Sequence, residues 1–384
     1  MRVLFITGEF PPMQGGVGDC TNEIARELAA RGVNVQVLTS TKVNDEPPIT
    51  NYGFPVLPIV DKWNWRILRV IQNTCREFQP DVAHIQYQTG AFGMHPAINF
   101  LPRFLRVPVV TTFHDLRVPY LFPKAGPVRE WVTRALAQSC AAVIATNDED
   151  FLKFETWNLR LASLIPIGSN ITTTPPADYN RAAWRAQLGV GQNETLLCYF
   201  GFLNESKGGE TLMRVLTQLP NAKLLMIGGQ VGASDPTNFA YLNKVKTLID
   251  ELGLTQRVIW TDHAAPAMVS AHFYASDICV MPYRDGASYR RGTLMAALAH
   301  GMAIVTTDAK IQISDVRTKL PPLRDNENCL LVPPADAPAI ASAVQRLVAT
   351  PELRAKIGAG ARALAQNFTW DKIADQHLAL YRQV

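Results

Sequence analysis

Short apolar segments alternate with amphipathic helical patterns along the whole chain, and no other feature of the sequence restricts the fold as strongly. In the first half the apolar segments are RVLFIT, VNVQVLT, VAHIQY, VPVVTTF and AAVIAT. Strands that are apolar on both faces and are joined by helices are typical of a parallel sheet that helices cover on both sides. The sequence therefore predicts an α/β fold with a doubly wound parallel sheet.

The pattern starts again in the second half, with the segments TLLCYFG, AKLLMIGG, RVIW, DICVMP, AIVTT and CLLVP. Between the halves, the stretch PIGSNITTTPPADYN is rich in Pro, Thr and Asn, which is typical of a linker. A chain of 384 residues is also long for a single domain. We therefore expect two doubly wound domains that join near residue 170.

The first predicted helix follows a glycine loop. Asp19 is its candidate N-cap, and Gly32 is the residue expected to end it. Cys20, Ile24 and Leu28 recur every four residues and would form the face that packs on the sheet.

Composition excludes several classes of protein. Hydrophobic residues make up 47% of the chain and charged residues 18%, and no apolar run approaches the roughly 20 residues of a membrane span. The chain starts with an apolar strand and lacks the features of a signal peptide, so we expect a cytoplasmic protein. Its six cysteines form no disulfide or zinc pattern, and we expect no metal site. The net charge of +4 is mild, and we expect no nucleic-acid partner.

Basic and aromatic residues are mixed in two segments, 61–80 and 101–108. Such a mixture could lie on an anionic membrane surface. The simpler interpretation, a helix that packs on the sheet and keeps its arginines in water, is favoured because most such helices do only that.

A glycine loop follows the first strand of each half. In the first, Gly15, Gly16 and Gly18 allow close backbone approach, and the amides of the next helix could bind an anion. The loop does not fit the G-x-G-x-x-G pattern, and the second strand ends in VLTST without an acid, which argues against NAD.

In the second half, Lys207 precedes Gly208 and Gly209 at the start of a helix. An ammonium group and a helix N-terminus would then face the same place, which suits a diphosphate. The alternative is a solvated surface lysine.

A further helix is predicted to begin at Gly292, Thr293 and Leu294, directly after Arg290 and Arg291. The amides of those three residues could complete an anion site to which the two arginines add charge. The alternative is that at least one of the arginines lies on the surface or pairs with a neighbouring carboxylate, Asp285.

Five motifs occur in one order along the chain: the P-P-x-x-G-G-x-G loop at 11–18, TTFHD at 111–115, IPIGSNI at 165–171, Lys207-Gly208, and AALAHGMAIVTTD at 296–308. In this combination the chain resembles the GT-B glycosyltransferases of family 4, and the resemblance extends to the terminal FTWDKIADQHLALYRQV.

The resemblance implies two Rossmann-like domains that face each other across a cleft. Residues 1–170 would form the acceptor-side domain and residues 171–367 the domain that binds the nucleotide sugar. The C-terminal helix, 368–384, would pack back on the first domain.

The resemblance also implies a retaining, metal-independent transfer of a sugar from a nucleotide donor to a hydroxyl acceptor. The donor would be a UDP- or GDP-sugar, which is a substrate and not a cofactor. The acceptor would be lipid-linked, a polysaccharide or a small molecule, and the enzyme would work in the cytoplasm or peripherally at the inner membrane face.

Residue roles follow from the same resemblance. His114 would lie by the donor sugar, Lys207 would steady the diphosphate, and Asp262 and His263 would lie by the nucleotide base. Asp115 would orient His114 or an acceptor hydroxyl, or it would cap the next loop. Without the resemblance, His114 is more simply a structural histidine at the end of a buried strand.

The chain departs from the family pattern at three positions. Two glutamates that usually read the sugar and the ribose are replaced by Ser288 and Ala296, and an arginine that usually binds the diphosphate is replaced by Phe202. We hypothesise that Arg290 and Arg291 supply the displaced phosphate-binding charge. The alternatives are recognition of an anionic sugar or a phosphorylated acceptor, and a protein that binds nucleotide sugars or other anions but is impaired in catalysis.

Overall fold

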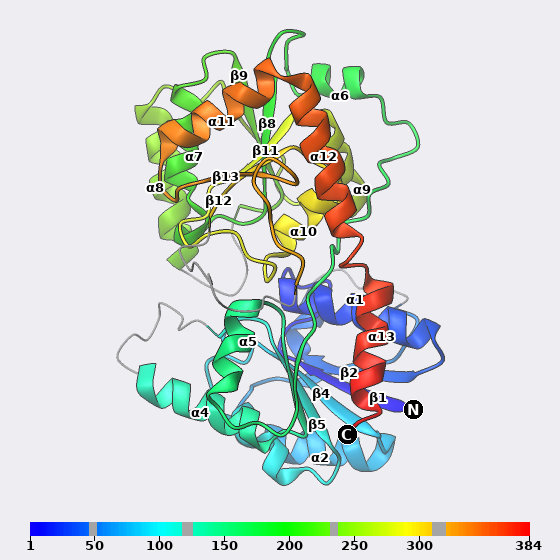
Figure 1. Cartoon of the computed structure of the whole chain (residues 1–384). Coiled ribbons are helices and arrows are strands. Elements are labelled where there is room, and N and C mark those ends of the chain that lie inside the picture. Colours follow the sequence, from blue (N-terminus) through cyan, green and yellow to red (C-terminus); the bar gives the residue numbers. More distant parts are fainter. Residues whose placement is uncertain (46–51, 117–125, 231–236, 309–319) are drawn as a thin grey trace. The chain divides into compact units, whose positions relative to one another are not determined.

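The computed structural model describes residues 1–45, 52–116, 126–230, 237–308 and 320–384. The chain forms two compact units, one of residues 1–167 with 370–384 and one of residues 168–369 (Figure 1). The boundaries expected at 170 and 368 lie within a few residues of these limits.

A parallel sheet of seven strands forms the centre of the first unit, in the order β3-β2-β1-β4-β5-β6-β7. Its strands are β1 (Arg2–Thr7), β2 (Asn34–Ser40), β3 (Val56–Val60), β4 (Val82–Tyr87), β5 (Val109–Phe113), β6 (Ala142–Ala145) and β7 (Ala162–Leu164). Its helices are α1 (Gly16–Ala30), α2 (Ile67–Phe78), α3 (Ala97–Phe100), α4 (Gly126–Ser139), α5 (Asp148–Glu155) and α13 (Trp370–Tyr381), with 3-10 turns η1 (Thr41–Asp45) and η2 (Leu101–Phe104).

The five strands predicted for this half are confirmed, and two further strands occur. Both lie at the edges of the sheet, where β3 contains Pro58 and β7 has three residues. Proline and short length are typical of edge strands and weaken the pattern from which a strand is predicted.

The predicted start of the first helix is wrong. Helix α1 begins at Gly16, and Gly15 occupies its N-cap position without a side-chain hydrogen bond. Asp19 therefore lies in the first turn. The predicted end is confirmed, because Gly32 follows the helix with a φ of 79°. Cys20, Ile24 and Leu28 are buried as expected.

The second unit has a parallel sheet of six strands in the order β10-β9-β8-β11-β12-β13. Its strands, all six of them predicted, are β8 (Thr195–Phe200), β9 (Ala222–Ile227), β10 (Val258–Trp260), β11 (Ile278–Met281), β12 (Ile304–Thr307) and β13 (Leu330–Val332). Its helices are α6 (Arg181–Gln187), α7 (Gly209–Thr217), α8 (Thr237–Glu251), α9 (Pro266–Ala275), α10 (Gly292–Ala299), α11 (Ala337–Ala349) and α12 (Pro351–Ala365), with a 3-10 turn η4 (Glu205–Lys207).

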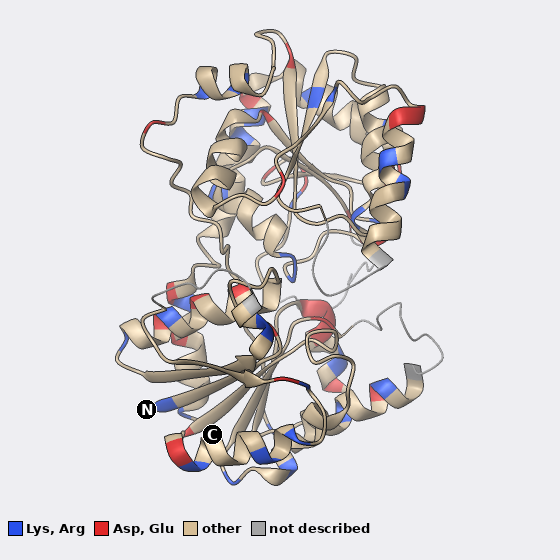
Figure 2. Ribbon diagram, turned by 180° about the vertical axis from the view of Figure 1, so that it is seen from behind, with Lys and Arg blue, Asp and Glu red and all other residues tan. Residues whose placement is uncertain are grey.

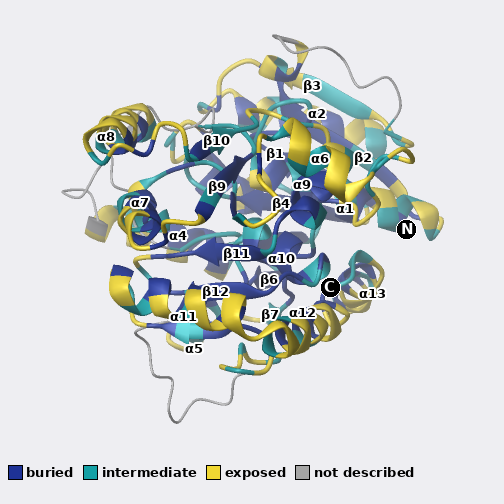
Figure 3. Ribbon diagram, turned by 90° about the horizontal axis from the view of Figure 1, so that it is seen from above, coloured by how far each residue is buried: buried dark blue, intermediate teal, exposed yellow. Residues whose placement is uncertain are grey.

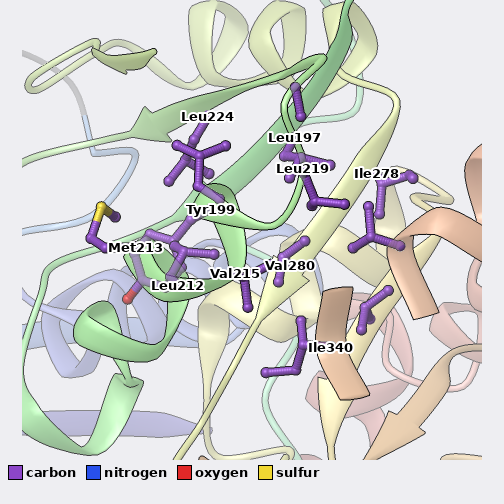
Figure 4. Packing of buried hydrophobic residues seen from close by; sticks show 14 of the residues in the cluster. Leu197, Tyr199, Leu212, Met213, Val215, Leu219, Leu224, Ile278, Val280 and Ile340 are labelled. Carbon is purple, nitrogen blue, oxygen red and sulfur yellow. The ribbon is translucent and has the colours of Figure 1, made fainter. Parts of the chain in front are cut away.

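The central strands of both sheets are buried, whereas the edge strands β3, β7 and β10 are mostly only partly buried, and exposed residues lie largely on the helices and loops (Figure 3). In the second unit, Leu197 and Tyr199 of β8 pack with Val280 of β11 and with residues of α7 and α11 in one apolar cluster (Figure 4). Burial on both faces explains why the strands are apolar throughout instead of alternating.

The last helix belongs to the first unit, where α13 packs on α1 (Figure 1). Arg31, directly after α1, forms ion pairs with Asp371 and, at 3.1 Å, with Asp375. Among the described helices, none is long and apolar enough to span a membrane.

Candidate active site

The loop after β1 is closed by a carboxylate from within the protein. Glu9 is buried, and its Oε1 accepts hydrogen bonds from the amides of Val17, at 3.0 Å, and Gly18, at 3.4 Å. The two amides belong to the first turn of α1, where a negative charge is favourable. Glu9 therefore does the capping that the sequence assigned to Asp19.

The glycines of this loop make room for Glu9. A Cβ at Gly15 would overlap with the Glu9 carboxylate, and its Oε2 would be 2.6 Å away. A Cβ at Gly18 would lie 2.9 Å from Phe10 Cα, whereas one at Gly16 would meet nothing within 4 Å. Two of the amides near these glycines already have an anionic partner, and binding of a donor phosphate at Gly15, Gly16 and Gly18 stays a prediction.

His114 lies at the carboxyl end of β5 and is partly buried. Its Nε2 is 2.7 Å from Oε1 of Gln86 on β4, and its Nδ1 has no hydrogen-bond partner in the described part of the chain. Burial, with a smaller effect of His377, lowers the pKa of His114 to about 4. The ring is therefore neutral near pH 7 and suits hydrogen bonding better than proton transfer.

Asp115 is partly buried beside His114. Leu116, which follows Asp115, fixes this part of the loop, because its amide donates to Oδ2 of Asp150 at 3.2 Å. Asp150 is fully buried at the start of α5, where Asn147 donates to it at 3.0 Å and caps the helix.

In the second unit, Lys207 lies in the turn between β8 and α7. Gly208 has a φ of 72°, and a Cβ there would overlap with the Pro282 carbonyl oxygen, so the turn requires glycine. A Cβ at Gly201 would lie 3.4 Å from Lys207 Nζ and would also overlap with the methyl group of Thr293. The ammonium group of Lys207 and the start of α10 therefore flank the same glycine.

Burial, together with the nearby positive charge of Arg291, lowers the pKa of Lys207 to about 7. Lys207 is partly buried in its turn, which disfavours the alternative of a fully solvated surface lysine.

Arg290 and Arg291 both bind one carboxylate. Arg290 Nη2 is 2.8 Å from Asp285 Oδ2, and Arg291 Nη2 forms an ion pair with Asp285 Oδ1. The side chains of Arg290 and Arg291 are 6% and 9% exposed. The alternative interpretation, pairing with Asp285, is thus confirmed for both arginines, yet two guanidinium groups on one carboxylate leave the trio positive.

Arg291 is also oriented by an aromatic ring and faces a helix start. Its guanidinium carbon lies 4.1 Å from the centre of the Tyr283 ring, and its Nε is buried without a partner in the described chain. The Tyr283 hydroxyl is 3.0 Å from Thr293 Oγ1. Helix α10 has no side-chain cap, and the amides of Gly292 and Thr293 have no partner among the described residues. Leu294, by contrast, donates its amide to the Arg291 carbonyl at 3.0 Å.

The three positions that depart from the family pattern have different surroundings. Phe202 is partly buried after Gly201, and its carbonyl accepts from the Tyr199 hydroxyl at 3.1 Å. The backbone carbonyl of Ser288 accepts a hydrogen bond from the Arg291 amide in the turn before α10. Ala296 is fully buried within α10, where a carboxylate would have to displace its packed neighbours.

Asp262 and His263 follow β10 at the carboxyl edge of the second sheet and are exposed. Gln230, which lies after β9, donates to Asp262 Oδ1 at 2.6 Å. The two residues share an edge with Lys207, but no described contact joins them to it.

Sequence reasoning missed three site residues: Glu9, Gln86 and His84. A signal for the last two was present, because H-x-Q on β4 and T-x-H at the end of β5 place polar groups on one face of neighbouring strands. Among the described residues, no group of His, Cys, Asp or Glu could hold a metal ion.

Fold and site define a protein with two doubly wound α/β units, one of which gathers positive charge at the carboxyl ends of its strands. Comparison with known proteins is consistent with this class. Residues 15–165 match the family described as glycosyl transferase 4-like domain, and residues 194–350 match glycosyl transferases group 1. The chain therefore belongs to this family of glycosyltransferases, and the GT-B fold class expected from the sequence is confirmed.

Curated relatives cover the whole chain at low identity. The D-inositol 3-phosphate glycosyltransferase of Xylanimonas cellulosilytica is 27% identical over 422 aligned residues, which cover 100% of this chain and 96% of the relative. The enzyme of the same name from Rhodococcus erythropolis is 26% identical, with 97% of this chain and 89% of the relative covered.

Solved structures show the same fold. HepE from Anabaena, in complex with UDP and glucose, has a TM-score of 0.79 and 20% identity, with 100% of both chains covered. The sucrose-phosphate synthase of Thermosynechococcus elongatus has a TM-score of 0.78 and 23% identity, with 100% of this chain and 98% of that chain covered.

The fit of Glu9 into the glycine loop gives a first prediction. Gly15→Ala should lower the free energy of unfolding by about 1–3 kcal/mol, because the new Cβ forces a buried carboxylate off its two amides. Gly16→Ala is the matched control and should change it by less than about 0.5 kcal/mol. Urea denaturation of both variants measures the difference, and equal stability of the two would contradict this role for Gly15.

Proposed function

We propose that the protein is a retaining, metal-independent glycosyltransferase that takes its sugar from a UDP- or GDP-sugar. The acceptor is a hydroxyl group on a lipid-linked, polysaccharide or small-molecule substrate. Inositol 3-phosphate belongs in a test of acceptors because curated relatives carry the name D-inositol 3-phosphate glycosyltransferase.

One observation carries the donor proposal. Lys207, Arg291 and the uncapped start of α10 gather positive charge and amide donors around Gly201. A diphosphate leaving group needs both, because negative charge develops on its oxygen as the sugar departs. Arg291 is the better candidate for direct contact because it directly precedes the uncapped start of α10, with Arg290 holding Asp285 in place.

Two alternatives share the same residues. The arginines could bind a carboxylate on the donor sugar or a phosphate on the acceptor, since guanidinium groups suit both. The protein could also bind a nucleotide sugar without turnover, which the side chains of Ser288 and Ala296 favour because neither can read a sugar hydroxyl as a carboxylate does.

Arg291→Ala should weaken binding of the sugar nucleotide by about 10- to 100-fold and leave binding of the free nucleoside unchanged, because the lost contact is a charged hydrogen bond to phosphate. Arg290→Ala should act in the same direction. Calorimetric titration with UDP-glucose, GDP-mannose, UDP-glucuronate, uridine and guanosine measures these effects.

Arg284→Ala is the control, since Arg284 is exposed and pairs with Glu205 at the surface. Equal weakening of nucleoside and sugar nucleotide would exclude the phosphate role. A loss confined to the uronic donor would favour recognition of an anionic sugar. Tight donor binding with neither transfer nor donor hydrolysis would identify a binding protein.

Donor binding should also depend on pH through Lys207. With a pKa of about 7, Lys207 is protonated at lower pH. Above pH 7 the amine is mostly neutral, so it must take up a proton from solution before it can form an ion pair with a diphosphate. Affinity for the bound nucleotide should therefore fall by up to about tenfold per pH unit between about pH 7 and 8.5.

Lys207→Arg provides the control because a guanidinium group stays charged across this range. That variant should bind with no slope, and Lys207→Met should bind more weakly, also with no slope. A slope that persists in both variants would assign the titration to another group.

For the first unit, we propose peripheral contact with an anionic membrane through a surface formed by α2, α3, η2 and α4. Trp65 and Trp131 are 52% and 60% exposed and flank the ring of Phe100. Arg103 lies over that ring, with 5.5 Å between its guanidinium carbon and the ring centre. These helices and the residues next to them carry arginines (Figure 2), and the exposed ones are Arg66, Arg69, Arg76, Arg103, Arg106 and Arg134. Exposed aromatic rings among cations are typical of an interfacial surface.

The double variant Trp65→Ser, Trp131→Ser should bind vesicles of phosphatidylglycerol at least about tenfold more weakly, because each ring loses roughly 1.5–3 kcal/mol of apolar burial. Vesicle co-sedimentation measures this, with Phe239→Ser on α8, 57% exposed in the second unit, as the matched control. Failure of the unaltered protein to bind the same vesicles at low salt would exclude the contact and leave the arginines as solvated side chains.

A further inference from the structure

A chain of buried polar groups runs from His114 to the last helix of the protein. His84 and Gln86 of β4 and Thr112 of β5 lie on one face of the first sheet, as strand periodicity requires, and His114 follows Thr112 by two residues. His84, Gln86 and Thr112 are buried, at 0–2% exposure. Tyr381, the last residue of α13, reaches the same group.

Each hydrogen bond in the chain restricts the next. Gln86 Oε1, 2.7 Å from His114 Nε2, can only accept, so His114 carries its proton on Nε2. The Gln86 amide nitrogen can only donate, and it lies 3.4 Å from His84 Nε2, which is therefore unprotonated. His84 then carries its proton on Nδ1 and donates to the Tyr381 hydroxyl at 2.5 Å.

The donor-to-acceptor direction of these hydrogen bonds depends on the side-chain amide of Gln86. If the side-chain amide of Gln86 were turned over, every donor would become an acceptor and His114 would carry its proton on Nδ1. Thr112 Oγ1, 2.8 Å from His84 Nε2, can serve in either direction, so it does not decide between them. The Tyr381 hydroxyl can likewise donate or accept, so the orientation of the Gln86 amide decides the tautomers of His84 and His114.

The surroundings keep all the rings of this chain neutral. Burial lowers the pKa of His84 and of His377, the latter to about 4. His377 donates from Nδ1 to the Ile373 carbonyl at 2.8 Å and lies beside His84, with 5.6 Å between the ring centres. Since a charge on one ring would repel a charge on its neighbour, the network transmits the direction of hydrogen bonds and no net charge.

We propose that Gln86 is a positioning residue that fixes the tautomer of His114, with Nε2–H held toward β4 and a bare Nδ1 left for the substrate. In this arrangement His84 donates from Nδ1 to the Tyr381 hydroxyl of α13, so removal of that hydroxyl leaves the Nδ1–H form of His84 without its acceptor. The inference rests on the proposed function in one respect, that His114 lies by the donor sugar. A bare Nδ1 accepts a hydrogen bond from a sugar hydroxyl, so the transferred sugar must offer a donor at this point.

The test is the tautomer of His114 in the full-length protein labelled with 15N-histidine. Long-range 1H–15N correlation at pH 7 separates the two tautomers of each of the seven histidines, and His114→Asn identifies the signals of His114. We expect the Nε2–H form. The Nδ1–H form would overturn the inference, whether or not the protein transfers sugar.

Two variants test whether Tyr381 and Gln86 control the protonation of His114. Tyr381→Phe keeps the packed ring but removes the acceptor of His84, so the hydrogen bonds should reverse and His114 should shift toward the Nδ1–H form. Gln86→Glu keeps an acceptor and adds a charge, and should raise the pKa of His114 by at least one unit in an NMR titration. An unchanged His114 spectrum in both variants would show that neither residue positions it.

Activity provides the second measurement. Gln86→Leu should lower kcat/KM by about 10- to 100-fold, mostly through kcat, as for other residues that orient a site group. Gln138→Leu is the matched control, since that amide donates to the Trp157 carbonyl at 2.8 Å. A normal kcat in Gln86→Leu would overturn the catalytic part of the inference. No transfer by the unaltered protein, with the expected tautomer in place, would instead refute the proposed function.

Discussion

Within each of the two sheets all paired strands are parallel, and the placement of the candidate site residues follows from that. In a parallel sheet the carboxyl ends of all strands lie at one edge, where the hydrogen-bonded ladder ends and the loops begin. His114 and Gln86 come to that edge from β5 and β4, and Lys207, Asp262 and Asp285 come to the corresponding edge of the second sheet. Residues far apart in the sequence are gathered by the direction of the ladder and not by local motifs.

Carboxylates organise both loop regions, although the expected ligand is an anion. Glu9 occupies two amides at the start of α1, and Asp285 holds two arginines before α10. A buried cation needs a partner in the free protein, and Asp285 supplies one without neutralising the pair. The second unit thus keeps both arginines folded inward.

Much of the fold could be predicted from the sequence, because buried parallel strands are apolar throughout and are easy to find. All eleven strands that the sequence indicated are present, while the short edge strands β3 and β7 gave too weak a pattern. The start of α1 was misplaced because its cap, Glu9, lies eight residues before Val17 and is brought there by tertiary structure.

For the site, the sequence pointed to the residues but not to their partners. Pairing with Asp285 was one of the interpretations that the sequence left open for the two arginines, and side-chain geometry was needed to show it for both. Gln86 was missed because the H-x-Q pattern of β4 becomes informative only beside the T-x-H pattern of β5. The role of Gln86 depends on its pairing position beside β5 in the sheet, which the sequence of one strand does not reveal.

The position of α13 affects how the protein is made. The first unit contains residues 1–167 and 370–384, so it lacks its last helix until the whole second unit has left the ribosome. Until then His84 has no Tyr381, and Arg31 pairs with Glu27 of α1 but lacks Asp371 and Asp375. A chain truncated before α13 would lack these contacts of its first unit even with its second unit intact.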